Sequence, residues 1–442
     1  MRGLILAAPG SGHGKTTLTL ALLRAMRDRG LRVAPAKIGP DYIDPTWHQR
    51  AAGRPSPNLD PWAMRAASLR RVLGALAGDA TFVLAEGVMG LFDGIDAVGT
   101  ASTGDLAARL GWPVVLVVDA HGMAASVAPL VAGFACHRPT VAIAGVILNR
   151  VGSAPHAALL RDALAAACPG IAVLGSLPRD AAIALPERHL GLVPAREASQ
   201  TETVIARAAE LVAASVDLDA LAGLAGGPAT WSVEDDEDDG GALLAPLGQR
   251  IAIAQDHAFL FAYPAQLALW RRAGVRLDFF SPLDDEPPPV DADAVFLPGG
   301  YPELHAGRLA AASRFAAGMR AAAARGVAIY GECGGYMTLG AGLVDADGRR
   351  HAMLGLLPVE TSFAERRLHL GYRDVVARSA TMLGSAGARF AGHEFHYARI
   401  VSEGAGEPLF DACDARGKAL GPAGRRVGSV AGSFVHLVDR RA

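Results

Sequence analysis

Short apolar runs recur along the first 195 residues, and longer segments with helical periodicity separate them. One such segment carries apolar residues at Leu18, Ala21, Leu22, Ala25 and Met26, which share one helical face. Strand-like runs that alternate with helix-like segments are typical of a parallel sheet covered by helices. The pattern predicts a doubly wound α/β fold, with strands at 3–8, 31–37, 81–85, 114–118, 141–148 and 171–174.

A second series of apolar runs begins at residue 250 and predicts another α/β unit, with strands at 250–256, 275–280, 294–297 and 327–330. Before it, the alanine- and valine-rich segment 200–225 predicts one helix. Six consecutive acids then run from Glu234 to Asp239. Like charges repel and stay solvated, so they indicate a linker. We expect two doubly wound α/β domains, at 1–225 and 249–442, joined by the linker 226–248.

Composition narrows the class of protein. Hydrophobic residues make up 51% of the 442 residues, and the net charge of −2 argues against an electrostatic grip on nucleic acid or an anionic membrane. The first apolar stretch is too short for a signal peptide, and no apolar run is long enough to span a bilayer. Cys136, Cys168, Cys333 and Cys413 lie far apart, which predicts neither a zinc site nor a disulfide framework. A cytoplasmic protein is expected.

The first strand runs into a glycine-rich loop that ends in Gly-Lys-Thr-Thr. Such a loop turns backbone N–H groups toward phosphates, while its lysine reaches the β- and γ-phosphates and its threonine hydroxyl ligates Mg²⁺. Pro9 stands at the usual first glycine position, so the strict motif is not met, and a purely structural turn is the alternative. The predicted ATP-binding residues here are Gly12, Gly14, Lys15, Thr16 and Thr17.

Polar residues follow three other predicted strands at the edge where open α/β sheets bind ligands. Asp41 and Asp44 follow the second strand, and each fits either a metal ligand or a turn or helix-cap residue. Glu86 follows the third, where P-loop enzymes place a carboxylate for magnesium or for water, and Asp93 is a weaker candidate. Asn149 fits either contact with a nucleotide base or a helix cap.

The segment Gly331–Gly335 places a thiol, Cys333, between a predicted strand and a predicted helix. A G-x-C-x-G turn lifts the sulfur clear of the sheet and sets it near backbone N–H groups and a helix N-terminus. Both features favour the thiolate, which is the nucleophilic form. The alternative is a small buried core residue, since free cysteine often serves as one.

A thiol nucleophile needs a base and a site for the developing oxyanion. The Gly299-Gly300 pair at a strand end can turn a backbone N–H toward an oxyanion, or it can be a plain tight turn. Among the downstream histidines, His436 stands out because glycines and a serine surround it at a predicted strand end, and His396 is the second choice. The remaining candidates are His351, His369 and His393.

These two sets of residues together indicate an amidotransferase ligase. One site would free ammonia from glutamine through a thioester on Cys333. The other would use ATP to convert a carboxylate, a poor electrophile, into a phosphoanhydride that ammonia opens. Ammonia must stay unprotonated, so it should pass between the sites away from bulk water.

The sequence resembles known families over nearly its whole length. PGG-Y-P-E, GECGGYM and SFVHL resemble class I glutamine amidotransferase domains, and the N-terminal half resembles the dethiobiotin-synthetase type of P-loop ATPase. With KIGPDYIDP, EGVMGLFDG and GHEFHYAR, the order resembles the cobyrinic acid a,c-diamide synthases, including the hydrogenobyrinic acid enzymes of cobalamin biosynthesis. The resemblance implies ATP- and glutamine-dependent amidation of the a and c acetates of a corrinoid polycarboxylate, with Mg²⁺.

The resemblance also implies functional roles for the residues at positions that match the family motifs. The resemblance implies Cys333 as the nucleophile, His436 as its activator, and an oxyanion hole around Gly300 and Gly334. It implies phosphate and magnesium binding by Lys15 and Thr16, with Asp41 and Glu86 as metal or carboxylate-activating residues, and it suggests a homodimer.

One position departs from the class I pattern. Those domains carry a glutamate two residues after the histidine, where this chain has Val438, so Glu394 or a backbone carbonyl is left to orient His436. Cobyric acid synthase and nickel-sirohydrochlorin a,c-diamide synthase are the nearest alternatives. A non-catalytic MinD-like ATPase switch is the alternative from another class.

Overall fold

The computed structural model describes residues 1–185, 187–188, 191–192, 201–227 and 243–441. The chain divides into two compact units, Met1–Trp62 with Leu69–Glu237, and Ala63–Ser68 with Asp238–Ala442. Most of the predicted acidic linker, including Glu234 to Asp239, lies outside the described residues.

The N-terminal unit is built on a seven-stranded sheet in the order β3-β2-β4-β1-β5-β6-β7, in which every pairing is parallel. Apolar runs buried on both faces suit this arrangement, and β1 and β4 are buried along their full length. The strands are β1 (Gly3–Ala7), β2 (Val33–Ile38), β3 (Asn58–Leu59), β4 (Phe82–Glu86), β5 (Val114–Asp119), β6 (Ile143–Val151) and β7 (Ala172–Pro178).

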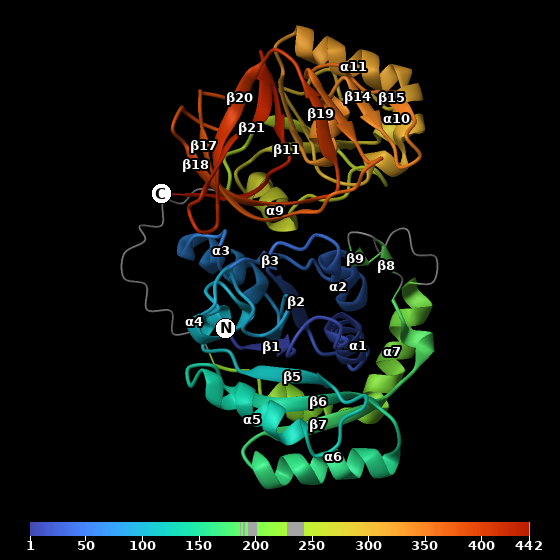
Figure 1. Ribbon diagram of the computed structural model, residues 1–442, viewed down its shortest axis with the longest axis vertical. Helices are drawn as coiled ribbons and strands as arrows, with labels where there is room; N and C mark the ends of the chain where they lie inside the picture. Colours follow the sequence, from blue (N-terminus) through green and yellow to red (C-terminus); the bar gives the residue numbers. More distant parts are fainter. Residues whose placement is uncertain (186, 189–190, 193–200, 228–242, 442) are drawn as a thin grey trace. The chain divides into compact units, whose positions relative to one another are not determined.

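Helices pack in groups around this sheet. Helix α1 packs against α2 and α7, whereas α5 packs against α6, and Figure 1 shows these groups apart from each other. The helices of the first 225 residues are α1 (Lys15–Asp28), α2 (Asp44–Ala52), α3 (Ala66–Ala77), α4 (Thr103–Leu110), α5 (Val127–His137), α6 (Ala154–Ala167), α7 (Thr201–Ser215) and α8 (Leu218–Gly223), with a 3₁₀ turn η1 (Ala181–Ile183) and the short pair β8 (Glu187–Arg188) and β9 (Gly191–Leu192).

The prediction of a single helix over 200–225 is wrong, because two helices, α7 and α8, occupy this segment. The chain leaves α7 at Val216, and Asp217 then caps α8 by accepting a hydrogen bond from the Ala220 N–H. An aspartate side chain competes for backbone N–H groups and so favours a new helix start over an uninterrupted helix.

The C-terminal unit contains a ten-stranded sheet in the order β11-β10-β12-β13-β22-β21-β20-β17-β18-β23, and a four-stranded sheet in the order β15-β14-β16-β19. The pairings from β11 to β22 are parallel, and those from β22 to β23 are antiparallel. The first strands are β10 (Arg250–Ala254), β11 (Arg276–Phe280), β12 (Ala294–Leu297), β13 (Ala328–Glu332), β14 (Gly342–Val344), β15 (Arg350–Ala352) and β16 (Val359–Ser362).

The later strands of this unit are β17 (His369–Ala377), β18 (Arg389–His396), β19 (Arg399–Glu403), β20 (Glu407–Asp414), β21 (Ala419–Val427), β22 (Val430–Ser433) and β23 (His436–Arg440). Its helical segments are α9 (Pro264–Arg272), α10 (Ala306–Ala311), α11 (Ser313–Ala324) and α12 (Gly334–Leu339), with the 3₁₀ turns η2 (Pro282–Asp284) and η3 (Pro302–Leu304).

Two hydrophobic clusters cover the two faces of the larger sheet. Phe315 of α11 packs in the cluster that contains Cys333, and Trp270 of α9 packs in the cluster that contains Tyr330. Figure 1 shows α9 and α11 on opposite sides of this unit. Since alternate strand residues face opposite sides, β13 directs Tyr330 and Glu332 away from the face where Cys333 lies.

Candidate functional site

The glycine-rich loop lies between β1 and the start of α1 at Lys15. Gly12 and Gly14 have φ of 82° and 87°, the left-handed region that glycine adopts without a Cβ penalty. The Lys15 ammonium donates hydrogen bonds to the Gly10 carbonyl at 3.1 Å and the Met89 carbonyl at 2.6 Å. Burial lowers the pKa of Lys15, although the Glu86 carboxylate acts in the opposite direction.

Asn149, at the end of β6, fixes the same loop from the other side. Its amide donates to the His13 carbonyl at 2.9 Å, and its Oδ1 accepts from the Arg150 N–H at 2.9 Å. A Cβ at Gly14 would come within 2.4 Å of the Asn149 Nδ2. The loop and this strand end therefore fit together only with glycine at position 14.

A buried polar cluster sits beside the loop, where β2 and β4 end. The Glu86 Oε1 accepts from the Thr16 hydroxyl at 2.6 Å and from the Lys37 ammonium at 2.9 Å. Lys37 also reaches the Asp44 Oδ2 at 2.5 Å, and the Thr16 hydroxyl lies 3.4 Å from the same oxygen. The loop threonine thus faces two carboxylates that share one ammonium.

His48 completes this cluster from α2. Its Nε2 lies 2.6 Å from the Glu86 Oε2 and its Nδ1 lies 3.2 Å from the Ser56 hydroxyl, with the ring fully buried. Burial acts to raise the pKa of Glu86, but Lys37 and His48 outweigh it and hold that pKa below its usual value. Burial and Asp41 raise the pKa of Asp44 to about 6, against the attraction of Lys37.

Sequence reasoning did not single out Lys37 or His48. Lys37 left a signal, because it is the one charged residue in an otherwise apolar strand, Val33–Ile38. His48 left none, since a histidine on a helix is usually structural. Its contact with Glu86 joins residues 38 positions apart in the sequence.

Asp41 and Asp93 hold backbone N–H groups. The Asp41 Oδ1 accepts from the N–H groups of Ile43 at 2.7 Å and Asp44 at 2.9 Å, at the start of α2. The Asp93 Oδ2 accepts from the Gly90 N–H at 2.7 Å. Of the four predicted acidic residues, Glu86 and Asp44 therefore contact Thr16 directly, whereas Asp41 and Asp93 stabilise turns.

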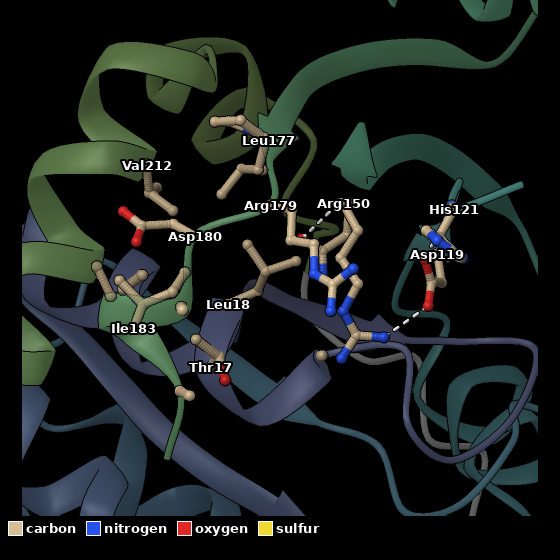
Figure 2. Close-up of a pocket in the computed structure, with 17 residues that line it drawn as sticks. Thr17, Leu18, Asp119, His121, Arg150, Leu177, Arg179, Asp180, Ile183 and Val212 are labelled. Carbon is tan, nitrogen blue, oxygen red and sulfur yellow. Dashed lines mark hydrogen bonds and ion pairs between the residues drawn. The ribbon is translucent and has the colours of Figure 1, made fainter. Parts of the chain in front are cut away.

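A pocket of about 410 Å³ opens beside the loop in the N-terminal unit. Figure 2 shows Thr17 and Leu18 of α1 at one wall, with Arg150 and Arg179 extending between them and Asp119. Arg150 pairs with Asp119 at 2.5 Å. The lining also includes Gly14, Asn149, Leu177, Asp180, Ile183 and Val212, which gives the pocket apolar walls and polar groups at its rim.

In the C-terminal unit, Cys333 forms a strained turn between β13 and α12. Its φ of 47° and ψ of −101° are unusual for a residue with a side chain. Its N–H donates to the Ser433 carbonyl at 2.8 Å, which ties the turn to the end of β22. This strand–turn–helix arrangement is the one that the G-x-C-x-G pattern predicts.

The turn favours the thiolate, as expected, but it does not determine the protonation state of Cys333. Cys333 is only 3% exposed, and this burial, with Glu303 nearby, raises the pKa of the thiol well above its ordinary value. The Gly334 N–H acts in the opposite direction but does not offset the burial. The resting sulfur is therefore a neutral thiol, so a base must take its proton during attack.

Three segments of the C-terminal unit converge near Cys333. A Cβ at Gly334 would lie 2.8 Å from the Gly300 nitrogen, and a Cβ at Gly299 would lie 2.4 Å from the His436 Cε1. The predicted oxyanion loop is thus in contact with both the cysteine turn and the imidazole ring. Glycine at these positions lets the three backbones approach closely.

His436 begins β23 and is 1% exposed. It pairs across strands with His393, and the two rings stack at 5.1 Å with an interplanar angle of 11°. Its Nδ1 lies 3.9 Å from the Glu332 Oε2. Burial, followed by His393 and His396, lowers the pKa of His436 well below its usual value, so the resting ring is neutral.

The other candidate histidines have different partners. His396 stacks on Phe434 at 3.8 Å and on His369 at 4.8 Å. His351 lies 2.7 Å from the Asp345 carboxylate. Glu394, considered as an orienting residue, instead pairs with Arg373 at 2.6 Å.

In the described part of the chain, no helix is both long and apolar enough to cross a bilayer. The same residues contain no group of three or more histidine, cysteine, aspartate or glutamate side chains arranged to hold a metal ion.

Comparisons with known proteins cover both units. Residues 4–193 match the CobQ/CobB/MinD/ParA nucleotide binding domain, and residues 250–441 match the CobB/CobQ-like glutamine amidotransferase domain. The hydrogenobyrinate a,c-diamide synthases of Brucella anthropi and Rhizobium meliloti are each 54% identical to this chain, and each match covers 99% of both proteins. A solved glutamine amidotransferase aligns over 42% of this chain and 89% of its own, with 20% identity and a TM-score of 0.30.

Proposed function

Because this chain belongs to the hydrogenobyrinate a,c-diamide synthase family, we propose that it amidates the a and c acetate carboxylates of hydrogenobyrinic acid, with ATP and glutamine as co-substrates. The observation that carries this proposal is the 54% identity over 99% of both chains, which includes both units. This identity favours the cobalt-free corrinoid over the cobalt-containing one as the substrate. It also favours an a,c-diamide as the product over the product of cobyric acid synthase. A cytoplasmic location and a homodimer stay predictions.

In the N-terminal unit, the loop from Gly12 to Lys15 would bind the ATP phosphates, with backbone N–H groups and one ammonium as donors. The 410 Å³ pocket next to Gly14 would take the nucleoside, with Asn149 at its polar end. Thr17 lines the same pocket. Asn149 lines this pocket and also donates a hydrogen bond to the His13 carbonyl of the loop, which supports its role in nucleotide binding.

The Thr16 hydroxyl and the Glu86 carboxylate are hard oxygen donors and lie 2.6 Å apart, with Asp44 close by. These donors fit Mg²⁺, which proteins usually hold through one or two carboxylates and the phosphates of a substrate. When bound, the ion would neutralise charge on the transferring phosphoryl group. Lys37 and His48 hold the carboxylates in place, and Lys37 supplies positive charge where an acyl phosphate would form.

In the C-terminal unit, the Cys333 sulfur would attack the side-chain amide carbon of glutamine while the His436 ring takes the thiol proton. Backbone N–H groups near Gly300 and Gly334 would stabilise the resulting oxyanion. The proton on His436 would then pass to the departing nitrogen, which leaves as ammonia and gives a thioester on Cys333. Water hydrolyses this thioester to glutamate and restores the thiol.

The test is an amidation assay followed by mass spectrometry. The purified protein is incubated with ATP, Mg²⁺ and glutamine, and with either hydrogenobyrinic acid or cobyrinic acid. We expect two amides on hydrogenobyrinic acid and slower conversion of the cobalt complex. No amidation of either acid would contradict the proposed function, whereas preference for cobyrinic acid would contradict only the cobalt-free assignment.

A further inference from the structure

The residue immediately before the nucleophile has a place in the C-terminal site that its position in the sequence does not indicate. We propose that Glu332 orients His436 and stabilises its protonated form during glutamine hydrolysis, a positioning role that rests on the proposed function. The place of a third group is open because Val438, two residues after His436, has no polar side chain.

The Glu332 carboxyl reaches β23 with both of its oxygens. The Oε1 accepts a hydrogen bond from the Leu437 N–H at 3.1 Å, and the Oε2 lies 3.9 Å from the His436 Nδ1. The first contact holds the Glu332 carboxyl against the backbone of Leu437, the residue after His436. The second contact directs the other carboxyl oxygen at the ring nitrogen, which leaves Nε2 as the nitrogen that would take the thiol proton.

A separation of 3.9 Å is longer than a hydrogen bond. A small rotation of the imidazole or the carboxyl would bring the two atoms into range, and catalytic hydrogen bonds of this kind often tighten only when substrate binds. The pair is well suited to such a role, because Glu332 is 4% exposed and His436 is 1% exposed, so water does not screen their attraction.

The topology explains how Glu332 reaches the ring from the correct side. Cys333 lies on one face of the sheet, whereas Glu332 and Tyr330 line a small cavity with Leu437 on the other face. The Glu332 carboxyl therefore approaches His436 from the face of the sheet opposite to the one on which Cys333 lies. In catalytic triads the base lies between the nucleophile and the carboxylate.

The other candidate groups are less well placed. Glu394 pairs with Arg373 at 2.6 Å, which gives its carboxylate a partner away from His436. His393 stacks face to face on the His436 ring, so it limits the tilt of that ring without accepting its N–H in the ring plane. Glu332 is the carboxyl that the structure places near Nδ1.

Protonation of His436 should make the role of Glu332 visible in the pH dependence of glutamine hydrolysis. When the His436 Nε2 takes the thiol proton, the ring becomes cationic, and an ionised Glu332 would accept from its Nδ1–H and stabilise that charge. Burial raises the pKa of Glu332 to about 8, although the Leu437 N–H acts to lower it. The ionised fraction, and with it kcat for glutamine hydrolysis, should rise as the pH increases through this value.

Neighbouring groups do not account for such a rise. The pKa of Cys333 and that of Tyr330 are raised well above their ordinary values, whereas that of His436 is well below its own and that of His393 is lowered to about 3. The titratable side chains near the carboxyl or the imidazole are Tyr263, Tyr330, Cys333, His393, His396 and His436, and the pKa of His396 is also lowered to about 3.

Glu332→Gln tests the proposal, because it keeps the shape and the acceptor for Leu437 but cannot ionise. We expect kcat for glutamine hydrolysis to fall by about 10²-fold while KM changes little. The pH-dependent rise near pH 8 should disappear. Ammonium-driven amidation should stay at the wild-type rate, which shows that the N-terminal site is intact, and an unchanged KM for glutamine shows that the C-terminal site is folded. Glu394→Gln is the matched control, with wild-type kcat and pH profile expected.

The possible results distinguish a failure of the role of Glu332 from a failure of the proposed function. Wild-type kcat in Glu332→Gln, or a wild-type kcat that is flat across this pH range, would overturn the role of Glu332. If Glu332→Gln does not fold, the wild-type profile and Glu332→Asp, which keeps an ionisable group and should retain the pH-dependent rise, still decide it. Failure of the wild-type protein to hydrolyse glutamine would instead contradict the proposed function.

Discussion

At the scale of single residues, burial and neighbours determine what each polar group does. Glu86 and Cys333 are both buried, but Lys37 and His48 keep the carboxylate ionised, whereas the thiol has no neighbouring cation among the causes of its pKa shift and stays neutral. The two sites therefore work differently. In the N-terminal unit, the Glu86 carboxylate is already ionised. In the C-terminal unit, the Cys333 thiol must lose its proton before its sulfur becomes a strong nucleophile.

Gly14→Ala tests whether the glycine-rich loop binds ATP in the geometry described. The new Cβ would meet the Asn149 Nδ2 at 2.4 Å, and the residue would be held at a φ of 87°. The left-handed backbone alone costs about 1–2 kcal/mol. We expect ATP affinity to fall by at least about tenfold, measured by isothermal titration with an ATP analogue.

Gly30→Ala provides the matched control for Gly14→Ala. Gly30 has a φ of 80° just after α1, but a Cβ there meets nothing within 4 Å. It should lower the free energy of unfolding by about 1 kcal/mol and leave ATP affinity unchanged. Equal losses of affinity in the two variants would contradict a specific role for the contact between Gly14 and Asn149.

At the scale of elements, strand ends and tight turns bring the reacting groups together. In the N-terminal unit, β1, β2, β4 and β6 are parallel strands of one sheet, so the groups after their carboxyl ends lie at one edge. In the C-terminal unit, α12 starts directly after Cys333 and packs on β12 and β13. The position of the sulfur therefore depends on how closely α12 approaches the sheet.

Gly335→Ala tests that dependence. A Cβ at Gly335 would lie 1.9 Å from the Leu297 carbonyl oxygen, so α12 would have to move away from β12. We expect the free energy of unfolding to fall by about 3 kcal/mol and glutamine hydrolysis to be lost, measured by urea unfolding and by glutamate release.

Gly307→Ala is the control for Gly335→Ala, since it lies in α10, where the nearest atom to a new Cβ is the His351 Cε1 at 3.8 Å. Alanine has the higher helix propensity, so the variant should be as stable as the wild type or about 1 kcal/mol more stable. Wild-type glutamate release by Gly335→Ala would contradict the close packing described for α12.

At the scale of the whole molecule, the chemistry divides between two units, each with its own sheet and site. The N-terminal unit contains the groups for phosphate, and the C-terminal unit contains the groups for amide hydrolysis. Ammonia is the only species that must be common to both. The two half-reactions should therefore be separable by changing the source of nitrogen.

Cys333→Ser tests this separation. We expect glutamine-driven amidation to fall by at least about 10³-fold, because a serine hydroxyl is a far weaker nucleophile under the same base. Amidation with added ammonium should continue at the wild-type rate, measured by mass spectrometry of the corrinoid. Cys413→Ser, at a half-buried position in β20, should retain both activities. If ammonium cannot restore amidation in Cys333→Ser, the division into two sites is wrong.

The sequence by itself determined most strands of the two parallel arrays and the two kinds of chemistry, because both depend on local signals. Buried strands are continuous apolar runs, as in 114–118, and the phosphate loop and the Cys333 turn each need glycines at fixed spacing around one reactive residue. Such patterns lie within about ten residues of the chain, where backbone conformation and periodicity are set.

Tertiary structure alone decided which residues act together and in which protonation state. Lys37, His48 and Glu86 are up to 49 positions apart, and Glu332 meets β23 from 105 positions away. Only the folded sheet brings them into contact. The neutral thiol of Cys333 and the raised pKa of Glu332 likewise result from burial, because removal from water disfavours charge and no local motif reports how deeply a side chain lies.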